Sequence, residues 1–568
     1  MHGWTSPVRW RLWASAALVA LLAACGGGGD GEGLVPRVQT ASGPVAAVVQ
    51  NGMLAYRRIP YAAPPVGALR WKAPADPQPW TTAIQSETSA NTCPQNSSSP
   101  YVIPSTNEDC LYLDVFTPQQ RGATLPVMVW IHGGAFLTGG AVTYGDPSAL
   151  VSRGVVVVNI NYRLGAFGFL AHPSLVAEQG GAAGNYGIMD QQKALQWVQA
   201  NIARFGGDPG NVTIFGESAG GFSVMTHLAS PLSKGLFQKA IVHSGAYAIN
   251  TQPSLTSAQT NATNVVNNTL AAAGISCPAP VTADCLRGIP ASAVPTLMTE
   301  YGKLNSSPVP IVDGRVLPKS VKATFIAGEN NKVPLINGSN RDEWGLFVAI
   351  TELTARKAAN PPNTDPNNTS FSLTAAAYPA YLGALVGLPS SSPALAGIVA
   401  AYPLANYGSN TAQQPSLGAT AMGTDVIFAC PALRVSQRNA NQGNATWMYE
   451  FRDRTAIPFV GSTSSGGYTL SFPQGAAHSY ELQYIFNLNP LRNDEQRALG
   501  SAMATYWTNF AKSSNPNSGA TVPVNWPNFT AASASVLGLD VASDGGITVM
   551  TDFETAHKCN TVWSAITF

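Results

Sequence analysis

A short apolar segment, 212–215 (VTIF), runs straight into Gly216-Glu217-Ser218-Ala219-Gly220 and then into a helical pattern that ends near Ala229. This order predicts a buried strand, a sharp turn and a helix, with the flanking glycines allowing close packing at the turn. Similar short runs, rich in β-branched residues, recur at 126–132, 154–160, 239–243 and 333–337, and a helix-length pattern covers 190–202. Runs of this kind are typical of parallel strands buried on both faces. The alternation predicts an α/β fold with a mostly parallel sheet and helices on both of its faces.

The charge balance excludes two classes of protein. The chain of 568 residues has 31 Lys+Arg and 30 Asp+Glu, a formal net charge of +1, and charged residues make up only 11% of it. A basic nucleic-acid-binding protein and an acidic disordered chain would both depart strongly from this balance. We therefore expect a globular protein without a nucleic-acid partner, and the sequence specifies no oligomeric state.

The N-terminus has the pattern of an export signal. Arg9 and Arg11 precede the apolar stretch 12–24, which is too short to span a bilayer and ends in Leu22-Ala23-Ala24-Cys25. That ending resembles the lipobox of bacterial lipoproteins, in which the cysteine is acylated. We predict a signal peptide over 1–24, a lipidated Cys25 with a glycine-rich tether over 25–34, and one domain over 35–568. An ordinary cleaved signal with an incidental cysteine is the alternative.

The cysteine count agrees with lipidation. Seven cysteines leave one unpaired, and setting Cys25 aside leaves six, an even number suited to an oxidising compartment. Sequence alone leaves the pairing open, but nearest neighbours along the chain suggest Cys93–Cys110, Cys277–Cys285 and Cys430–Cys559. No cysteine or histidine cluster has metal-ligand spacing, so no metal site is expected.

The turn around Ser218 fits the motif G-x-S-x-G in the strand-to-helix context that this motif requires. The longer run 205–220 (FGGDPGNVTIFGESAG) and a second run, 108–116 (EDCLYLDVF), resemble the signatures of type-B carboxylesterases, the group that includes cholinesterases and bacterial para-nitrobenzyl esterases. Further resemblance lies in segments 59–70, 130–136, 161–170 and 184–197. The resemblance implies a single α/β-hydrolase domain from about residue 35, with a central mostly parallel sheet and large insertions, and Ser218 as the nucleophile.

A seryl hydroxyl needs a histidine to take its proton and a carboxylate to orient that histidine. In α/β-hydrolases the chain order is serine, acid, histidine. Four histidines follow Ser218: His227, His243, His478 and His557. His478 lies in GAAHSYEL, which matches the family pattern Gly-x-x-His-x-x-Glu-Leu, and an amphipathic helix is expected after it. His227 and His243 precede any plausible acid and are expected to be core histidines, and His557 lies near the chain end.

The acid follows from the segment after the strand at 333–337. Its sequence, Asn340-Arg341-Asp342-Glu343, matches the family motif Asn-x-Asp-Glu and places the catalytic carboxylate at Glu343. Asp342 is the alternative, and we expect it to cap the following helix. Trp344 stands where many relatives have glycine, which predicts altered local packing.

The oxyanion hole needs backbone N–H groups directed at the carbonyl oxygen. His132-Gly133-Gly134-Ala135-Phe136 resembles the HGGG-type loop, so the resemblance implies Gly134, Ala135 and Ala219 as the donors. It also implies two structural ion pairs, Arg70 with Glu108 and Arg163 with Asp190.

The implied reaction is two-step hydrolysis of a small-molecule ester through an acyl-enzyme, with no cofactor. Cholinesterases bind a quaternary ammonium on a Trp in the first disulfide loop, but the segment from Cys93 to Cys110 contains no Trp, only Tyr101, which argues against a choline ester. Trp80 resembles a structural position instead. A lipase or polyester depolymerase, and a non-catalytic cholinesterase-like module, are the alternatives. We expect an exported protein, either lipid-anchored in the bacterial cell envelope at the outer membrane, with no other membrane contact, or secreted.

Overall fold

The computed structural model describes residues 36–96, 103–120, 124–303, 309–359, 361–365, 367–460, 468–530 and 532–565. Arg37–Phe568 forms one compact unit. The predicted signal peptide, Cys25, the glycine tether and Tyr101 lie outside the described residues.

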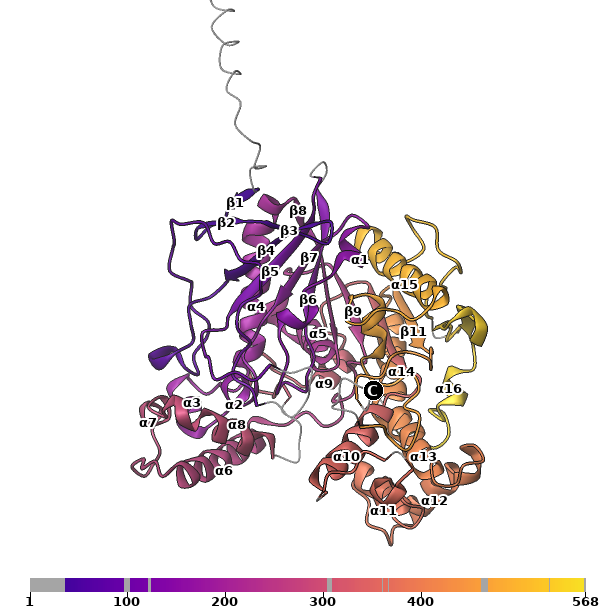
Figure 1. Cartoon of the computed structure of the whole chain (residues 1–568). Helices are drawn as coiled ribbons and strands as arrows, with labels where there is room; N and C mark the ends of the chain where they lie inside the picture. Colours follow the sequence, from indigo (N-terminus) through magenta and orange to yellow (C-terminus); the bar gives the residue numbers. More distant parts are fainter. Residues whose placement is uncertain are drawn as a thin grey trace, which may run out of the picture. The chain divides into compact units, whose positions relative to one another are not determined.

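The described residues form an eleven-stranded sheet with the order β13-β12-β11-β10-β9-β8-β6-β7-β5-β4-β3. The strands from β12 to β7 are parallel, and antiparallel strands complete both edges. This confirms the predicted α/β class with a mostly parallel sheet (Figure 1). The strands are β3 (Val48–Gln50), β4 (Met53–Pro60), β5 (Tyr112–Pro118), β6 (Leu125–Ile131), β7 (Val156–Ile160), β8 (Gly207–Glu217), β9 (Lys239–His243), β10 (Leu335–Asn340), β11 (Thr446–Phe451), β12 (Val536–Leu539) and β13 (Thr548–Met550); β1 (Arg37–Gln39) and β2 (Pro44–Ala46) pair separately.

The sequence located these strands better than it located their ends. β9 has the predicted bounds, whereas β8 begins at Gly207, inside a segment whose Gly and Pro residues indicate a turn. The early start is possible because Leu125 of β6 pairs with Gly207, and an irregularity in the register before Val127 accommodates the turn-forming residues.

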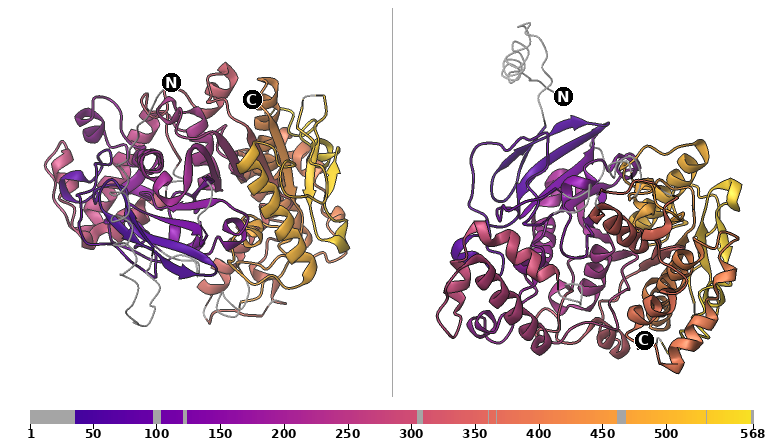
Figure 2. Two further views of the ribbon diagram at one scale, coloured as in Figure 1. Left: turned by 90° about the horizontal axis from the view of Figure 1, so that it is seen from above. Right: turned by 60° about the horizontal axis from the view of Figure 1, so that its bottom comes forward.

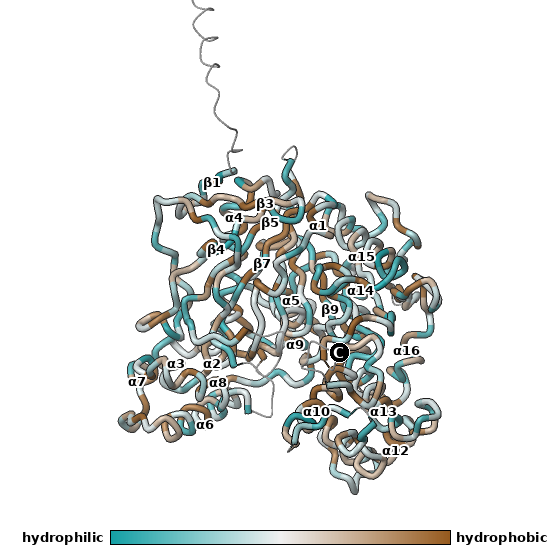
Figure 3. The backbone as a smooth tube through the Cα atoms, in the orientation of Figure 1, coloured by the Kyte–Doolittle hydropathy of each residue, from teal (hydrophilic) through white to brown (hydrophobic). Residues whose placement is uncertain are grey.

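Each face of the sheet covers its own apolar core. Along β6, Val127, Val129 and Ile131 enter one core, and Met128 and Trp130 enter the other, as the two-residue period of a strand requires. The first core is covered by α4 (Tyr186–Asn201), α5 (Ala219–Ala229) and α14 (Cys430–Asn441), and the second by α1 (Ser148–Val151) and α15 (Asp494–Ser513). Both views of Figure 2 show the gold helix α15 alongside the strands, and Figure 3 shows hydrophobic residues gathered in the central strands.

The remaining helices lie in segments between strands, except for α16, which follows β13. They are α2 (Gly165–Phe169), α3 (Pro173–Glu178), α6 (Leu255–Ala273), α7 (Ala283–Arg287), α8 (Val294–Gly302), α9 (Val321–Ala327), α10 (Gly345–Ala358), α11 (Tyr378–Val386), α12 (Pro393–Ala401), α13 (Gln414–Gly423) and α16 (Phe553–Ala556). A π-helical turn, Thr424–Ala429, joins α13 to α14. In the part of the chain that is described, this run, Gln414–Asn441, is the one helix long and apolar enough to cross a membrane, but 78% of its most apolar window is buried inside the protein, as in the core helix of a globular domain.

The structure links Cys93 with Cys110, Cys277 with Cys285 and Cys430 with Cys559, the pairing of nearest neighbours along the chain. It also contains the two expected ion pairs, Arg70–Glu108 at 2.5 Å and Arg163–Asp190 at 2.7 Å. The second pair is fully buried. Half-removing such a pair leaves an uncompensated buried charge, so we regard both pairs as structural.

Candidate active site

Ser218 lies at the turn between β8 and α5. Its backbone has φ 55° and ψ −120°, a strained conformation for a residue other than glycine that costs about 1–3 kcal/mol. The turn stays sharp because Gly216 and Gly220 lie against each other: a Cβ on Gly216 would come within 2.6 Å of the Gly220 backbone. The Ser218 N–H donates to the His243 carbonyl of β9, 3.0 Å away. Ser218 itself is only half-buried, which leaves the hydroxyl within reach of a substrate.

His478 lies beside the segment that follows β10. Its Nδ1 is hydrogen-bonded to Glu343 Oε2 at 2.5 Å, and its backbone N–H donates to the Glu343 carbonyl at 3.3 Å. Among the described residues, His478 Nε2 has no hydrogen-bond partner, although Glu217 Oε1 lies 3.0 Å away outside hydrogen-bond geometry. The carboxylate acceptor places the proton on Nδ1, so Nε2 is left as a proton acceptor in the neutral imidazole.

Glu343 is held rigidly. Its Oε1 accepts hydrogen bonds from Ser244 Oγ at 2.5 Å and from the Asn340 N–H at 2.7 Å, and the residue is fully buried. These bonds direct the other oxygen at His478. Sequence reasoning missed Ser244, which directly follows β9; the only signal for it is its place at the carboxyl end of a strand next to β10.

The expected helix cap at Asp342 was wrong. Helix α10 begins after Trp344 without a side-chain cap. The Asp342 carboxylate instead accepts from Arg454 at 2.7 and 2.8 Å and from the Ala476 N–H at 3.0 Å. The Asp342 carboxylate therefore binds Arg454 and the loop that carries His478 instead of capping the helix, because a charged arginine is a stronger partner than the helix terminus.

Glu217, the residue just before Ser218, places a second carboxylate beside His478. This carboxylate was not predicted from the sequence. Its Oε1 accepts from Ser479 Oγ at 2.6 Å. Burial raises the pKa of Glu217 to about 8, although the nearby His478 opposes the shift. Burial alone would lower the pKa of His478, but Glu217 and Glu343 together raise it to about 9. The only signal in the sequence is the variable position of the motif itself.

The segment after His478 is not the expected amphipathic helix. It is a short 3₁₀ helix, Tyr480–Tyr484, whose residues are all buried. This helix has no exposed polar face, because all of its residues are buried. Even Glu481 is buried, and its carboxylate accepts a hydrogen bond from Asn340 Nδ2 at 2.6 Å. His243 lies beside it and accepts from Trp507 Nε1 at 2.9 Å, so this histidine is a hydrogen-bonded core residue, as predicted.

The other two histidines are also fully engaged. His227 is hydrogen-bonded through Nδ1 to Ser233 and through Nε2 to Gln191, each at 2.9 Å, and burial lowers its pKa to about 3. His557 lies between Asp425 and Glu450, with both ring nitrogens in contact with carboxylate oxygens. Neither has a ring nitrogen left for a seryl proton.

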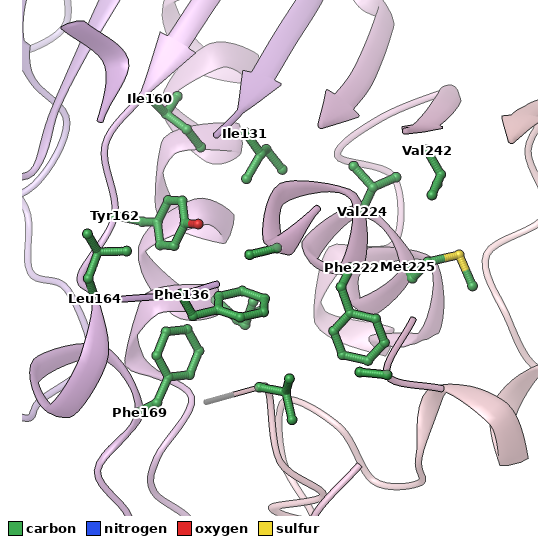
Figure 4. Close-up of a cluster of buried hydrophobic side chains, with 14 of the residues drawn as sticks. Ile131, Phe136, Ile160, Tyr162, Leu164, Phe169, Phe222, Val224, Met225 and Val242 are labelled. Atoms are coloured by element: carbon green, nitrogen blue, oxygen red, sulfur yellow. The ribbon is translucent and has the colours of Figure 1, made fainter. Parts of the chain in front are cut away.

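The glycine-rich loop after β6 turns back on itself. Gly134 has φ 104°, and its carbonyl accepts from the N–H groups of Leu137 and Thr138; a Cβ there would come within 2.2 Å of the Thr138 carbonyl oxygen. Within the described chain, the N–H groups of Gly134 and Ala135 donate to no protein acceptor. Ala219 opens α5, where N–H groups have no intrahelical partner. Phe136 anchors the loop in the apolar cluster of Figure 4, at the strand ends beside α5.

Aromatic rings surround the imidazole. The centroids of Phe428 and Phe347 lie 4.9 and 5.3 Å from that of His478. Trp344 stacks on Phe347, and the packing change expected from this tryptophan is accommodated by Gly423, where a Cβ would come within 2.2 Å of the Trp344 ring. Tyr247 extends the cluster from Phe428 to α5.

Fold and site together place the protein among the serine hydrolases with an α/β-hydrolase fold. The family model of the carboxylesterase family matches residues 35–562. The chain is 34% identical to para-nitrobenzyl esterase of Bacillus subtilis (strain 168), over 89% of this chain and 94% of the relative, and 33% identical to carboxylesterase 1E of Mus musculus, over 91% and 92%. A solved structure of a PNB esterase superposes with a TM-score of 0.71 at 31% identity, covering 92% of this chain and 98% of the other.

The chain therefore belongs to the carboxylesterase family and is a carboxylic-ester hydrolase. The family suggested by the sequence motifs and the α/β-hydrolase fold are both confirmed. No group of three or more histidine, cysteine or acidic residues in the described ranges is arranged to hold a metal ion.

Proposed function

We propose that Ser218, Glu343 and His478 form the catalytic triad and that the enzyme hydrolyses esters through an acyl-enzyme. The observation that carries this proposal is the arrangement of the His478 ring, with Nδ1 bonded to Glu343 Oε2 at 2.5 Å and Nε2 left without a hydrogen-bond partner in the described residues. A general base needs this combination: one nitrogen fixes the tautomer and the other is free to take a proton.

In the proposed reaction, Ser218 Oγ attacks the ester carbonyl while His478 Nε2 takes the seryl proton. Glu343 stabilises the imidazolium that results. The N–H groups of Gly134, Ala135 and Ala219 donate to the carbonyl oxygen as negative charge develops on it. The imidazolium then returns the proton to the departing alcohol, which leaves Ser218 acylated. Water, activated by the same Nε2, repeats the sequence and releases the acid.

The test is Ser218→Ala against para-nitrophenyl butyrate, with Ser152→Ala as a matched control at an exposed serine. We expect turnover to fall by several orders of magnitude in the first variant and to stay unchanged in the second. An organophosphate should label wild-type Ser218 stoichiometrically, with the adduct located by mass spectrometry. Near-wild-type turnover of folded Ser218→Ala would remove this serine from the mechanism.

The substrate is a small-molecule ester, and the geometry gives no support to a choline ester. Trp80, the tryptophan nearest to Cys93 along the chain, donates from Nε1 to the Pro44 carbonyl at 2.8 Å and packs on Gly43. It therefore has a structural role at the N-terminal strands. Turnover of an emulsified triglyceride compared with soluble para-nitrophenyl butyrate distinguishes a lipase from a carboxylesterase acting on soluble esters.

The location of the enzyme is a separate proposal. The lipobox-like ending at Cys25, the odd cysteine count and the glycine tether support lipidation of Cys25 and anchoring at the outer membrane of a Gram-negative cell. Three disulfides suit the oxidising space this requires. Wild type and Cys25→Ala are to be expressed in a Gram-negative host and fractionated. We expect only the wild type in the membrane, and a soluble, unmodified wild-type protein would leave a secreted esterase.

A further inference from the structure

A second buried histidine that lies between two carboxylates, His557, forms an ion cluster on the opposite side of the π-helical turn from the candidate active site. His557 Nδ1 lies 2.6 Å from Asp425 Oδ1, and Nε2 lies 2.6 Å from Glu450 Oε1. Ionised carboxylates only accept hydrogen bonds, so both ring nitrogens donate and the imidazole is positively charged. We refer to Asp425, Glu450 and His557 as the His557 cluster.

The cluster is extended by further polar groups. Tyr402 donates its hydroxyl to Asp425 Oδ2 at 2.6 Å and accepts from Trp563 Nε1 at 2.6 Å, while Arg452 pairs with the second oxygen of Glu450 at 2.5 Å. Each carboxylate of the cluster therefore has two partners. All three members of the His557 cluster are buried.

The cluster joins three distant segments of the chain. His557 ends α16 near the C-terminus, Asp425 belongs to the π-helical turn, and Glu450 lies on β11. The disulfide Cys430–Cys559 connects the same C-terminal segment to the first residue of α14, directly after the turn. The C-terminal segment thus holds both ends of the π-helical turn, Asp425 by charge and Cys430 by a covalent bond.

The opposite side of the turn meets the catalytic machinery. Phe428, three residues after Asp425, places its ring 4.9 Å from the His478 imidazole. Thr424 Oγ1 accepts from the backbone N–H of Trp344, next to Glu343, at 3.1 Å. A π-helical turn is a rare interruption of an α-helix and is frequently found at functional sites. Here the extra residue per turn lets Asp425 face the C-terminal segment while Phe428 faces His478.

We propose that the His557 cluster and the Cys430–Cys559 disulfide fix the π-helical turn so that Phe428 forms a specificity-determining wall beside His478, with His557 as a positioning residue. The proposal rests on the proposed role of His478. A substrate whose carbonyl is attacked by Ser218 must pass one of its two groups along this ring. The Phe428 ring therefore limits the bulk of that group, and it does so only while the turn is held.

The experiment is a double-mutant cycle of Phe428→Ala and His557→Gln, read as the ratio of kcat/KM for a bulky ester to that for a small one. Para-nitrophenyl benzoate against para-nitrophenyl acetate varies the acyl group, and benzyl acetate against ethyl acetate varies the alcohol. In one of these series Phe428→Ala should shift the ratio about tenfold or more towards the bulky ester, the scale expected for a change in pocket size. His557→Gln should shift the same ratio in the same direction by about threefold or more.

The coupling between the two changes decides the proposal. If His557 acts through Phe428, adding His557→Gln to Phe428→Ala should leave the ratio within about twofold of Phe428→Ala alone. A merely structural histidine would lower stability and leave the ratio unchanged. Glu108→Gln is the matched control, because it breaks a buried ion pair with Arg70, away from the π-helical turn, and it should destabilise without moving the ratio.

Cys430→Ser/Cys559→Ser is the second route, because it frees the turn while the His557 cluster keeps its charges paired. It should move the ratio in the same direction, and it replaces His557→Gln if that variant does not fold. The proposal would be overturned if the ratio of kcat/KM for the bulky ester to that for the small one stayed within about twofold of wild type in whichever of these variants folds. It would also be overturned if the shifts caused by Phe428→Ala and His557→Gln were additive in the double variant. Titration with an organophosphate separates this failure from failure of the triad, because an inactive Ser218 would not be labelled, whereas loss of the His557 effect would leave the labelling of Ser218 intact.

Discussion

Two buried histidines in this enzyme, His478 and His557, each lie between two carboxylates, and only His478 keeps a ring nitrogen without a hydrogen-bond partner among the described residues. His557 contacts both of its partners at 2.6 Å, so its two ring nitrogens are both donors. The ring of His478 makes one hydrogen bond, from Nδ1 to Glu343, while Glu217 lies close to Nε2 outside hydrogen-bond geometry. The two sites differ in one hydrogen bond, the one from Nε2 to the second carboxylate, which His557 makes and His478 does not.

The comparison shows that nearby negative charge does not by itself identify a catalytic histidine. Burial opposes protonation at both sites, and the flanking carboxylates outweigh it at both, raising the pKa of His478 to about 9 and that of His557 to about 10. The proposed difference in role depends on where the second carboxylate is directed. Ser479 binds Glu217 Oε1, whereas Glu450 Oε1 is directed straight at His557 Nε2.

The strongest test of this contrast replaces each histidine in turn. His478→Gln should reduce kcat by a factor on the order of 10⁵ to 10⁶, because loss of the base disables the whole triad. His557→Gln should keep kcat for a small ester within about tenfold of wild type. Turnover of para-nitrophenyl acetate measures both, with circular dichroism to check folding. Comparable losses in the two folded variants would remove the distinction.

The second test concerns the orienting acid. Glu343→Gln should lower kcat by about 10⁴-fold, because an amide cannot hold the required tautomer or stabilise the imidazolium. Asp342→Asn is the matched neighbour and should cost less than about tenfold, since it affects only the contact between Arg454 and the histidine loop. The reverse ranking, with both proteins folded, would transfer the role to Asp342.

The third test uses stability. The pKa of His557 is raised from 6.5 to about 10 in the folded protein, so its ion pairs contribute stability that is complete below pH 6.5 and is lost as the pH rises through about 10. The free energy of unfolding of wild type should exceed that of His557→Gln by about 3–5 kcal/mol at neutral pH, and the gap should shrink towards pH 10. Urea unfolding at several pH values measures it. A gap independent of pH would mean that His557 is neutral.

The smallest expected effect is a shift in pH dependence. Glu217→Gln removes one of the two carboxylates that raise the pKa of His478, so the imidazole should lose its proton at lower pH. Because the base must be neutral to act, the rising limb of kcat/KM against pH should move to lower pH by about one unit. Glu495→Gln, on α15, is the control and should leave the limb in place. A shift to higher pH would contradict the proposed geometry.

The sequence determined the features that depend on neighbouring residues. The turn at Ser218 follows from an apolar strand, two flanking glycines and a helix within a few positions, and these local preferences agree with one another. The order of serine, acid and histidine along the chain is likewise present in the sequence, and motif resemblance selected Glu343 and His478 from it. The central strands could be predicted because strands buried on both faces are continuous apolar runs.

Only the tertiary structure decided which polar side chains meet. Glu343 and His478 are 135 positions apart, and His557 is 107 positions from Glu450, so their contacts depend on the order of strands in the sheet. The same dependence explains why Asp342 binds Arg454 instead of capping α10 as predicted. It also explains why the sequence did not predict the Glu217 carboxylate beside the His478 imidazole. The role of a carboxylate depends on the direction of its oxygens and on the groups packed around it. Both are determined by the tertiary structure, not by the neighbouring residues in the sequence.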